Sequence, residues 1–183
     1  MLSGYEKKWP ELPAKWTPPE NLHITLVFLG DLTDIELGQV CMTVKDIAKN
    51  HNSFNITLNK IAYGPAEKIP PRYIWAGGEK GEELSLLKKD LEDALLEVVH
   101  FVPDKGAFSP HITLARIGAF AWRAIDPEER PEVNENIDLI FTVESIDVME
   151  SESKRGQDAR ASHKMGAPVS GPHYTIIESH QLQ

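Results

Sequence analysis

An α+β fold made of two related lobes is predicted by three observations on this 183-residue sequence. The tetrapeptide His-Ile-Thr-Leu occurs twice, at residues 23–26 and 111–114, once in each half of the chain. Segments with the alternation of strands outnumber the two long segments with helical spacing. The two kinds of segment also do not alternate regularly, which argues against a doubly wound parallel sheet and favours mixed strands and helices.

Residues 1–50 are predicted to hold one motif strand and one helix. Four prolines within residues 1–20 disfavour a long helix or a central strand there, so we expect irregular structure. Residues 22–29 alternate as a strand, with His23 and Thr25 on the opposite face from the apolar residues between them. Thr33 and Glu36 form a capping-box pattern that begins a helix with apolar residues at helical spacing up to Ala48.

The rest of the chain is predicted to be richer in strands. The expected elements are a strand at 54–58, a loop from 63, a short strand at 72–76, a helix at 82–99, the second motif strand at 111–116, a short helix from 126, one bent strand or two over 137–149, a polar loop at 151–170 and a last strand at 173–178.

Composition limits the possible partners and location. The net charge of −9 argues against extended binding to duplex DNA, although a local cationic pocket still suits a small nucleotide or an RNA end. We expect no membrane partner, because no apolar run approaches the length of a span and the N-terminus lacks the apolar core of a signal peptide. Cys41 is the only cysteine, which excludes an intramolecular disulfide and a Cys-rich zinc site. These features predict a cytoplasmic protein.

The repeated motif supplies two His-x-Thr units whose polar side chains share one face of each strand. If the strands are paired, two imidazoles and two hydroxyls converge, and this set suits in-line displacement at phosphorus. One imidazole takes a proton from the attacking water and the other protonates the leaving alkoxide. The Thr hydroxyls donate to the non-bridging oxygens. One such unit is more often structural, but two identical copies favour catalysis. We expect no metal and no cofactor.

At this level of detail the chain resembles the two-histidine phosphoesterase superfamily, and within it the RNA 2′,3′-cyclic phosphodiesterases, also called 2′-5′ RNA ligases. The matching segments are PPENLHITLVFLG, the stretch from Tyr63 to Trp75, FSPHITLAR, and VESIDVMESE with the later GPHYTIIE. Arg116 directly after the second motif and the MESE…GPHYTI ending are typical of this family.

The resemblance implies a bilobal fold, with two related antiparallel-sheet lobes flanked by helices around a central cleft. It also implies hydrolysis of a 2′,3′-cyclic phosphate to a 2′-phosphate. By that resemblance His23 is the proton donor to the 3′ leaving oxygen and His111 is the proton acceptor from water. Thr25 and Thr113 would hold the phosphate, and Arg116 would contact it or stabilise the cleft.

Further substrate contacts and partners follow from the same reasoning. Phe108 and Tyr63 are candidates for stacking on a base. Arg72, in the matching loop and strand, is a further candidate substrate contact, and Trp75 is assigned to the core. The expected partners are RNA ends or small cyclic nucleotides. Alternative functions are 2′-5′ ligation or 2′-5′ oligoadenylate cleavage at the same site, or a non-catalytic module that binds RNA ends. The oligomeric state stays open.

The expected organisation is one bilobal phosphoesterase domain over residues 1–183. Members of the family usually begin with an apolar strand and a helix before the first motif, and we expect both to be missing here. An insertion at 154–170 is locally basic. Its Ser/Gly/Ala-rich composition favours a surface loop, and the alternative is a flap that contacts RNA phosphates.

Overall fold

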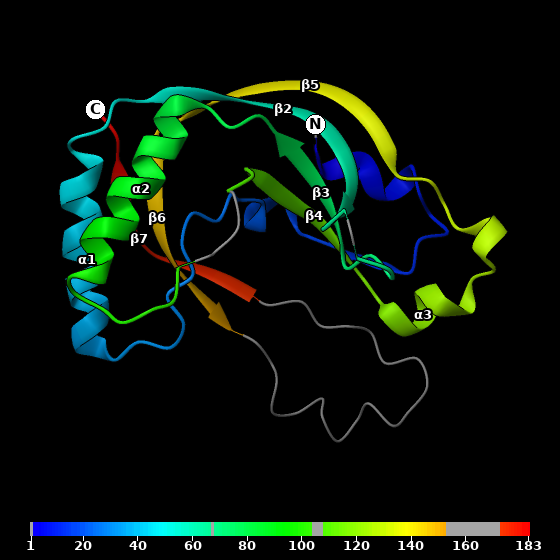
Figure 1. Cartoon of the computed structure of the whole chain (residues 1–183), viewed down its shortest axis with the longest axis horizontal. Helices are drawn as coiled ribbons and strands as arrows, with labels where there is room; N and C mark the ends of the chain where they lie inside the picture. Colours follow the sequence, from blue (N-terminus) through cyan, green and yellow to red (C-terminus); the bar gives the residue numbers. More distant parts are fainter. Residues whose placement is uncertain (1, 67, 104–107, 153–172) are drawn as a thin grey trace.

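The computed structural model describes residues 2–66, 68–103, 108–152 and 173–183, and it confirms the α+β class with two antiparallel sheets (Figure 1). A five-stranded sheet has the order β1-β4-β3-β2-β5, and β6 and β7 form a separate pair. The strands are β1 (Ala14–Trp16), β2 (Phe54–Gly64), β3 (Tyr73–Gly78), β4 (His111–Ile117), β5 (Asn134–Val143), β6 (Ser145–Glu152) and β7 (His173–Gln181).

Two long helices, α1 (Asp34–Ala48) and α2 (Glu82–Leu96), lie side by side at one end of the molecule, and β2 and β5 extend from there toward the other end (Figure 1). The predicted capping box is confirmed, since the Thr33 N–H donates to the Glu36 carboxylate at 2.8 Å and the Glu36 N–H donates back to the Thr33 hydroxyl at 3.4 Å. In α2, leucines at helical spacing are buried (Leu84, Leu87, Leu91 and Leu95). Helix α1 packs on α2, β6 and β7.

The predicted strand at 22–29 is wrong. Of these residues only Ile24 takes part in strand pairing, through an isolated antiparallel bridge to Ile112 of β4. The reason lies just upstream, where β1 pairs with one end of β4 and the chain then leaves that edge. Pro18 and Pro19 interrupt the ladder, a 3₁₀ turn follows at Pro19–Asn21, and the chain returns to β4 at Ile24. The first motif therefore continues an interrupted edge strand.

Other boundaries also differ from prediction. The irregular stretch 1–20 contains the short edge strand β1 and the 3₁₀ helix η1 (Leu2–Lys7). Strand β2 continues through the expected loop start to Gly64, α2 ends three residues early, and the helix α3 (Ala119–Ala124) was missed. A 3₁₀ helix η3 (Pro127–Glu129) stands where a short helix was expected, and 137–149 contains two strands. The predicted insertion at 154–170 lies outside the described residues.

The core joins the five-stranded sheet to the helices. Its most buried side chains come from several sheet strands and from both long helices (Val40, Leu58, Ile61, Ile74, Leu87 and Leu114). On β4 the apolar residues Ile112 and Leu114 face this core, and His111 and Thr113 alternate with them and stay half-buried on the other face. No helix in the described part of the chain is long and apolar enough to cross a membrane.

Candidate functional site

The two motifs lie side by side, although only one of them is a regular strand. The antiparallel bridge joins the central isoleucines, Ile24 and Ile112. In that register His23 stands beside Thr113, and Thr25 stands beside His111. Both isoleucines contact the core, and the four polar side chains are half-buried. The convergence expected from the repeated motif therefore has a structural basis in one β-bridge.

Each histidine makes the same local hydrogen bond. The Nδ1 atom of His23 lies 2.7 Å from the carbonyl oxygen of Asn21, and the Nδ1 atom of His111 lies 2.9 Å from that of Ser109. A carbonyl can only accept, so each Nδ1 carries the proton. This leaves Nε2 of each ring for the substrate, as an acceptor in the neutral form and a donor in the protonated form. The same hydrogen bond, to the carbonyl two residues upstream in both motifs, gives both neutral imidazoles the same tautomer.

An aromatic ring contacts each imidazole. Trp75 of β3 stacks on His111 with ring centroids 3.9 Å apart, and Tyr174 of β7 meets the His23 ring edge-on at 4.7 Å. Trp75, predicted for the core, thus lies against a motif residue, and no sequence pattern predicted the contact of Tyr174. Gly64 makes the Trp75 position possible, because a Cβ there would lie 2.1 Å from the indole ring. The neighbouring aromatics restrict rotation of both imidazoles.

Arg116 reaches the same face through a β-bulge. It is five residues beyond His111, an odd number that would place it on the opposite face of a regular strand. The register between β3 and β4 shifts after Ile74, so that Leu114 has no partner and the alternation is reversed beyond it. The Arg116 guanidinium then lies 5.2 Å from the centroid of the Tyr73 ring. Tyr73 in turn stacks on Trp75 at 5.9 Å, which connects Arg116 to His111 along one face.

The other predicted substrate contacts lie in different surroundings. The Tyr63 hydroxyl donates to the carbonyl of Pro131, and its ring packs edge-on against Trp122 at 5.3 Å. Burial raises the pKa of Tyr63 to about 12. Phe108 has the Lys88 ammonium 5.4 Å from its ring centroid.

Arg72 is exposed at the start of β3. Its backbone N–H donates to Gly64 and its carbonyl accepts from Ile117, so it ties three neighbouring strands together. No side-chain hydrogen bond or ion pair of Arg72 occurs within the described ranges. The structure thus groups Arg116 with the motif residues, whereas Tyr63 is engaged elsewhere.

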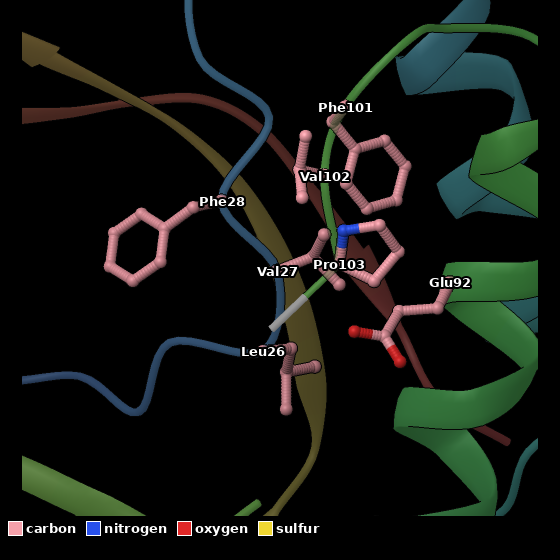
Figure 2. Close-up of a pocket in the computed structure, with 7 residues that line it drawn as sticks. All are labelled: Leu26, Val27, Phe28, Glu92, Phe101, Val102 and Pro103. Atoms are coloured by element: carbon pink, nitrogen blue, oxygen red, sulfur yellow. The ribbon is translucent and has the colours of Figure 1, made fainter. Parts of the chain in front are cut away.

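A small pocket lies next to the segment that follows the first motif (Figure 2). Its lining comes from the segment after Thr25, from α2 and from the segment that follows α2 (Leu26, Val27, Phe28, Glu92, Phe101, Val102 and Pro103). In Figure 2 the Phe28 side chain points away from the other lining residues. An apolar lining with one carboxylate does not suit an anionic ligand.

Clusters that could ligate a metal are missing from the part of the chain that the structure describes: no group of three or more His, Cys, Asp or Glu side chains occurs there.

Comparisons with known proteins identify related sequences and related folds. Residues 1–75 match the family model described as LigT like Phosphoesterase. A Thermus thermophilus protein named RNA 2′,3′-cyclic phosphodiesterase is 32% identical over 188 aligned residues, which cover 100% of this chain and 83% of the relative.

Solved structures share the fold. The crystal structure of TT0787 of Thermus thermophilus has a TM-score of 0.76 and 28% identity, and the match covers 99% of this chain and 89% of that one. Escherichia coli LigT complexed with 3′-AMP has a TM-score of 0.69 at 19% identity, over 99% and 88% of the two chains.

Proposed function

The chain belongs to the family of RNA 2′,3′-cyclic phosphodiesterases, two-histidine enzymes that hydrolyse phosphodiester bonds, and on this premise we propose that it converts the 2′,3′-cyclic phosphate of an RNA or nucleotide end to a 2′-phosphate. One observation carries the proposal: two His-x-Thr units meet at a single β-bridge, and both imidazoles present Nε2 while Nδ1 donates to a backbone carbonyl.

The proposed reaction needs one proton acceptor and one proton donor. Neutral His111 accepts a proton at Nε2 from the water whose oxygen attacks phosphorus. Protonated His23 donates its Nε2 proton to the 3′ oxygen as the bond between phosphorus and that oxygen breaks. The Thr25 and Thr113 hydroxyls donate to the non-bridging oxygens, where negative charge is concentrated in the transition state. These groups complete the proton balance, so the proposed reaction is independent of metal ions.

The nature of the partners follows from the same premise. Escherichia coli LigT, which shares this fold, has been crystallised with the nucleotide 3′-AMP. We propose that RNA ends or small cyclic nucleotides bind at the motif face, within one bilobal phosphoesterase domain that spans the chain. The cytoplasmic location expected from the sequence stays a prediction.

The test is hydrolysis of adenosine 2′,3′-cyclic phosphate in EDTA, with identification of the product. We expect turnover to adenosine 2′-phosphate, and a loss of about a thousandfold or more in kcat for His23→Ala and for His111→Ala, because each removes one proton-transfer group. His100→Ala is the matched control, since His100 is exposed and follows α2.

Two results would contradict the proposal. The first is activity that disappears in EDTA and returns with a divalent ion. The second is a folded His111→Ala variant, judged by its thermal unfolding, that retains wild-type turnover. The same preparation incubated with cyclic-ended RNA halves and with 2′-5′ oligoadenylate distinguishes hydrolysis from the two alternative reactions of this site.

A further inference from the structure

The polar face of the sheet extends beyond the motif residues to two cations, Lys15 and Arg116. Lys15 of β1 is the register partner of Arg116 of β4. Directly paired residues of antiparallel strands project to the same face. Arg116 shares its face with Tyr73, Trp75 and His111 through three successive ring contacts. Lys15 therefore lies on the face that carries the candidate catalytic groups.

The positive charges of Lys15 and Arg116 are available to an anionic ligand. Lys15 is exposed, and within the described residues neither Lys15 nor Arg116 forms a salt bridge with a carboxylate. Lys15 and Arg116 thus place two cations in adjacent strands of a chain with a net charge of −9. Such a local concentration of positive charge attracts an anion even when the whole protein is acidic.

The opposite side of the motifs is acidic in its sequence. Strands β6 and β7, which carry Tyr174 beside His23, contain no Lys or Arg and four carboxylates (Asp147, Glu150, Glu152 and Glu178). A polyanion held at the two histidines is drawn toward the cations of β1 and β4. Electrostatics thus favours one direction for a bound strand.

Lys15 lies well away from the phosphate that the two His-x-Thr units would hold. Arg116 is three residues along β4 from Thr113, about 10 Å at the usual rise of a strand, and Lys15 is one strand further out. The Thr113 hydroxyl and the Lys15 ammonium are thus too far apart to bind oxygens of the same phosphate. A second phosphate, further along the same nucleic-acid strand, suits the position of Lys15.

We infer that Lys15 is a substrate-binding residue that, together with Arg116, holds the phosphate on the 5′ side of the nucleotide with the cyclic end. The inference rests on the proposed function, since it takes the two His-x-Thr units as the site of the cyclic phosphate. In an RNA strand this 5′ phosphate is the linkage to the preceding nucleotide. The site accordingly prefers an RNA end, or a 5′-phosphorylated nucleotide, over an unphosphorylated nucleoside cyclic phosphate.

Binding of product analogues tests the inference without turnover. Adenosine 2′-phosphate and adenosine 2′,5′-bisphosphate differ only in the 5′ phosphate, and calorimetry measures both dissociation constants. We expect the wild type to bind the bisphosphate about tenfold more tightly, as one charge-assisted contact allows. Lys15→Ala should remove most of that preference while leaving the affinity for adenosine 2′-phosphate within about twofold, and Lys15→Arg should retain the preference.

A matched control separates a local contact from a change of net charge. Lys45 is exposed on α1, and Lys45→Ala removes the same charge from a different surface. We expect this variant to keep the wild-type preference. For a short RNA with a cyclic end, Lys15→Ala should also reduce the slope of log binding constant against log salt by about 0.7, the value for one phosphate contact to a single strand.

The outcomes are distinguishable. An equal loss of affinity for both analogues in Lys15→Ala, or no loss for either, overturns the inference and leaves the proposed function standing. Lack of turnover on any cyclic phosphate, with the bisphosphate preference intact and dependent on Lys15, overturns the proposed reaction and leaves the binding position standing. A wild type without any preference for the bisphosphate also overturns the inference.

Discussion

At the scale of single residues, the two histidines are prepared alike by their own backbones. The carbonyl two residues upstream fixes the Nδ1 proton in both motifs, so that Nε2 of each neutral ring is the acceptor nitrogen. What differs between them is the neighbour, an indole face at His111 and a phenol edge at His23. The division into proton donor and proton acceptor therefore depends on the surroundings of the rings and on the bound phosphate.

Tyr63 provides a residue-scale prediction, because its hydroxyl is engaged with Pro131. We expect Tyr63→Phe to lower the free energy of unfolding by about 1 kcal/mol through loss of this hydrogen bond. Turnover of the cyclic phosphate should stay within about twofold of wild type, since the ring packs on Trp122. Urea unfolding and steady-state kinetics measure the two quantities. A large rise in KM at unchanged stability would instead show that Tyr63 contacts the substrate.

At the scale of elements, one irregularity in β4 decides which side chains meet. The bulge at Leu114 brings Arg116 onto the face of His111 and Thr113. On the neighbouring edge, the break at Pro18 and Pro19 separates β1 from the first motif and lets both contact β4 at different heights. Regular strands would have placed Arg116 in the core and left the cation pair unformed.

The first turn of helix α1 is stabilised by the capping box, and this leads to a prediction about stability. Thr33→Ala removes the hydroxyl of the capping box, and we expect the free energy of unfolding to fall by about 1 kcal/mol. Gly38→Ala is a control of opposite sign in the same helix. A Cβ at Gly38 meets nothing within 4 Å, so this change should stabilise the protein by about 0.5–1 kcal/mol. Equal denaturation midpoints for wild type and Thr33→Ala would show that the cap contributes nothing.

At the scale of the whole molecule, α1 connects the helical end to the small sheet. Cys41 of α1 contacts Glu178 of β7, and burial together with that carboxylate raises the pKa of the thiol to about 11. An unfolded chain releases this proton nearer 9.0, the ordinary value. As the pH rises from 9 to 11 the unfolded state therefore loses the proton before the folded state does, and the free energy of unfolding decreases.

The predicted decrease in the free energy of unfolding at alkaline pH is measured by urea unfolding at a series of pH values from 8 to 11. We expect the stability of the wild type to decline over this range more steeply than that of Cys41→Ala, which lacks the thiol. Tyr63→Phe serves as a second reference, because Tyr63 also has a raised pKa and titrates at still higher pH. Parallel curves for wild type and Cys41→Ala would mean that the thiol titrates alike in both states.

The sequence by itself determined the features that depend on near neighbours. Capping and apolar spacing predicted where α1 begins and most of α2, and the repeated tetrapeptide predicted the paired His-x-Thr units. Only the tertiary structure decided which strands are neighbours. The single bridge at Ile24, the bulge that turns Arg116, the position of Lys15 beside it and the Trp75 ring on His111 all depend on strand register. Register is set by contacts between residues far apart in the chain, and no local pattern records it.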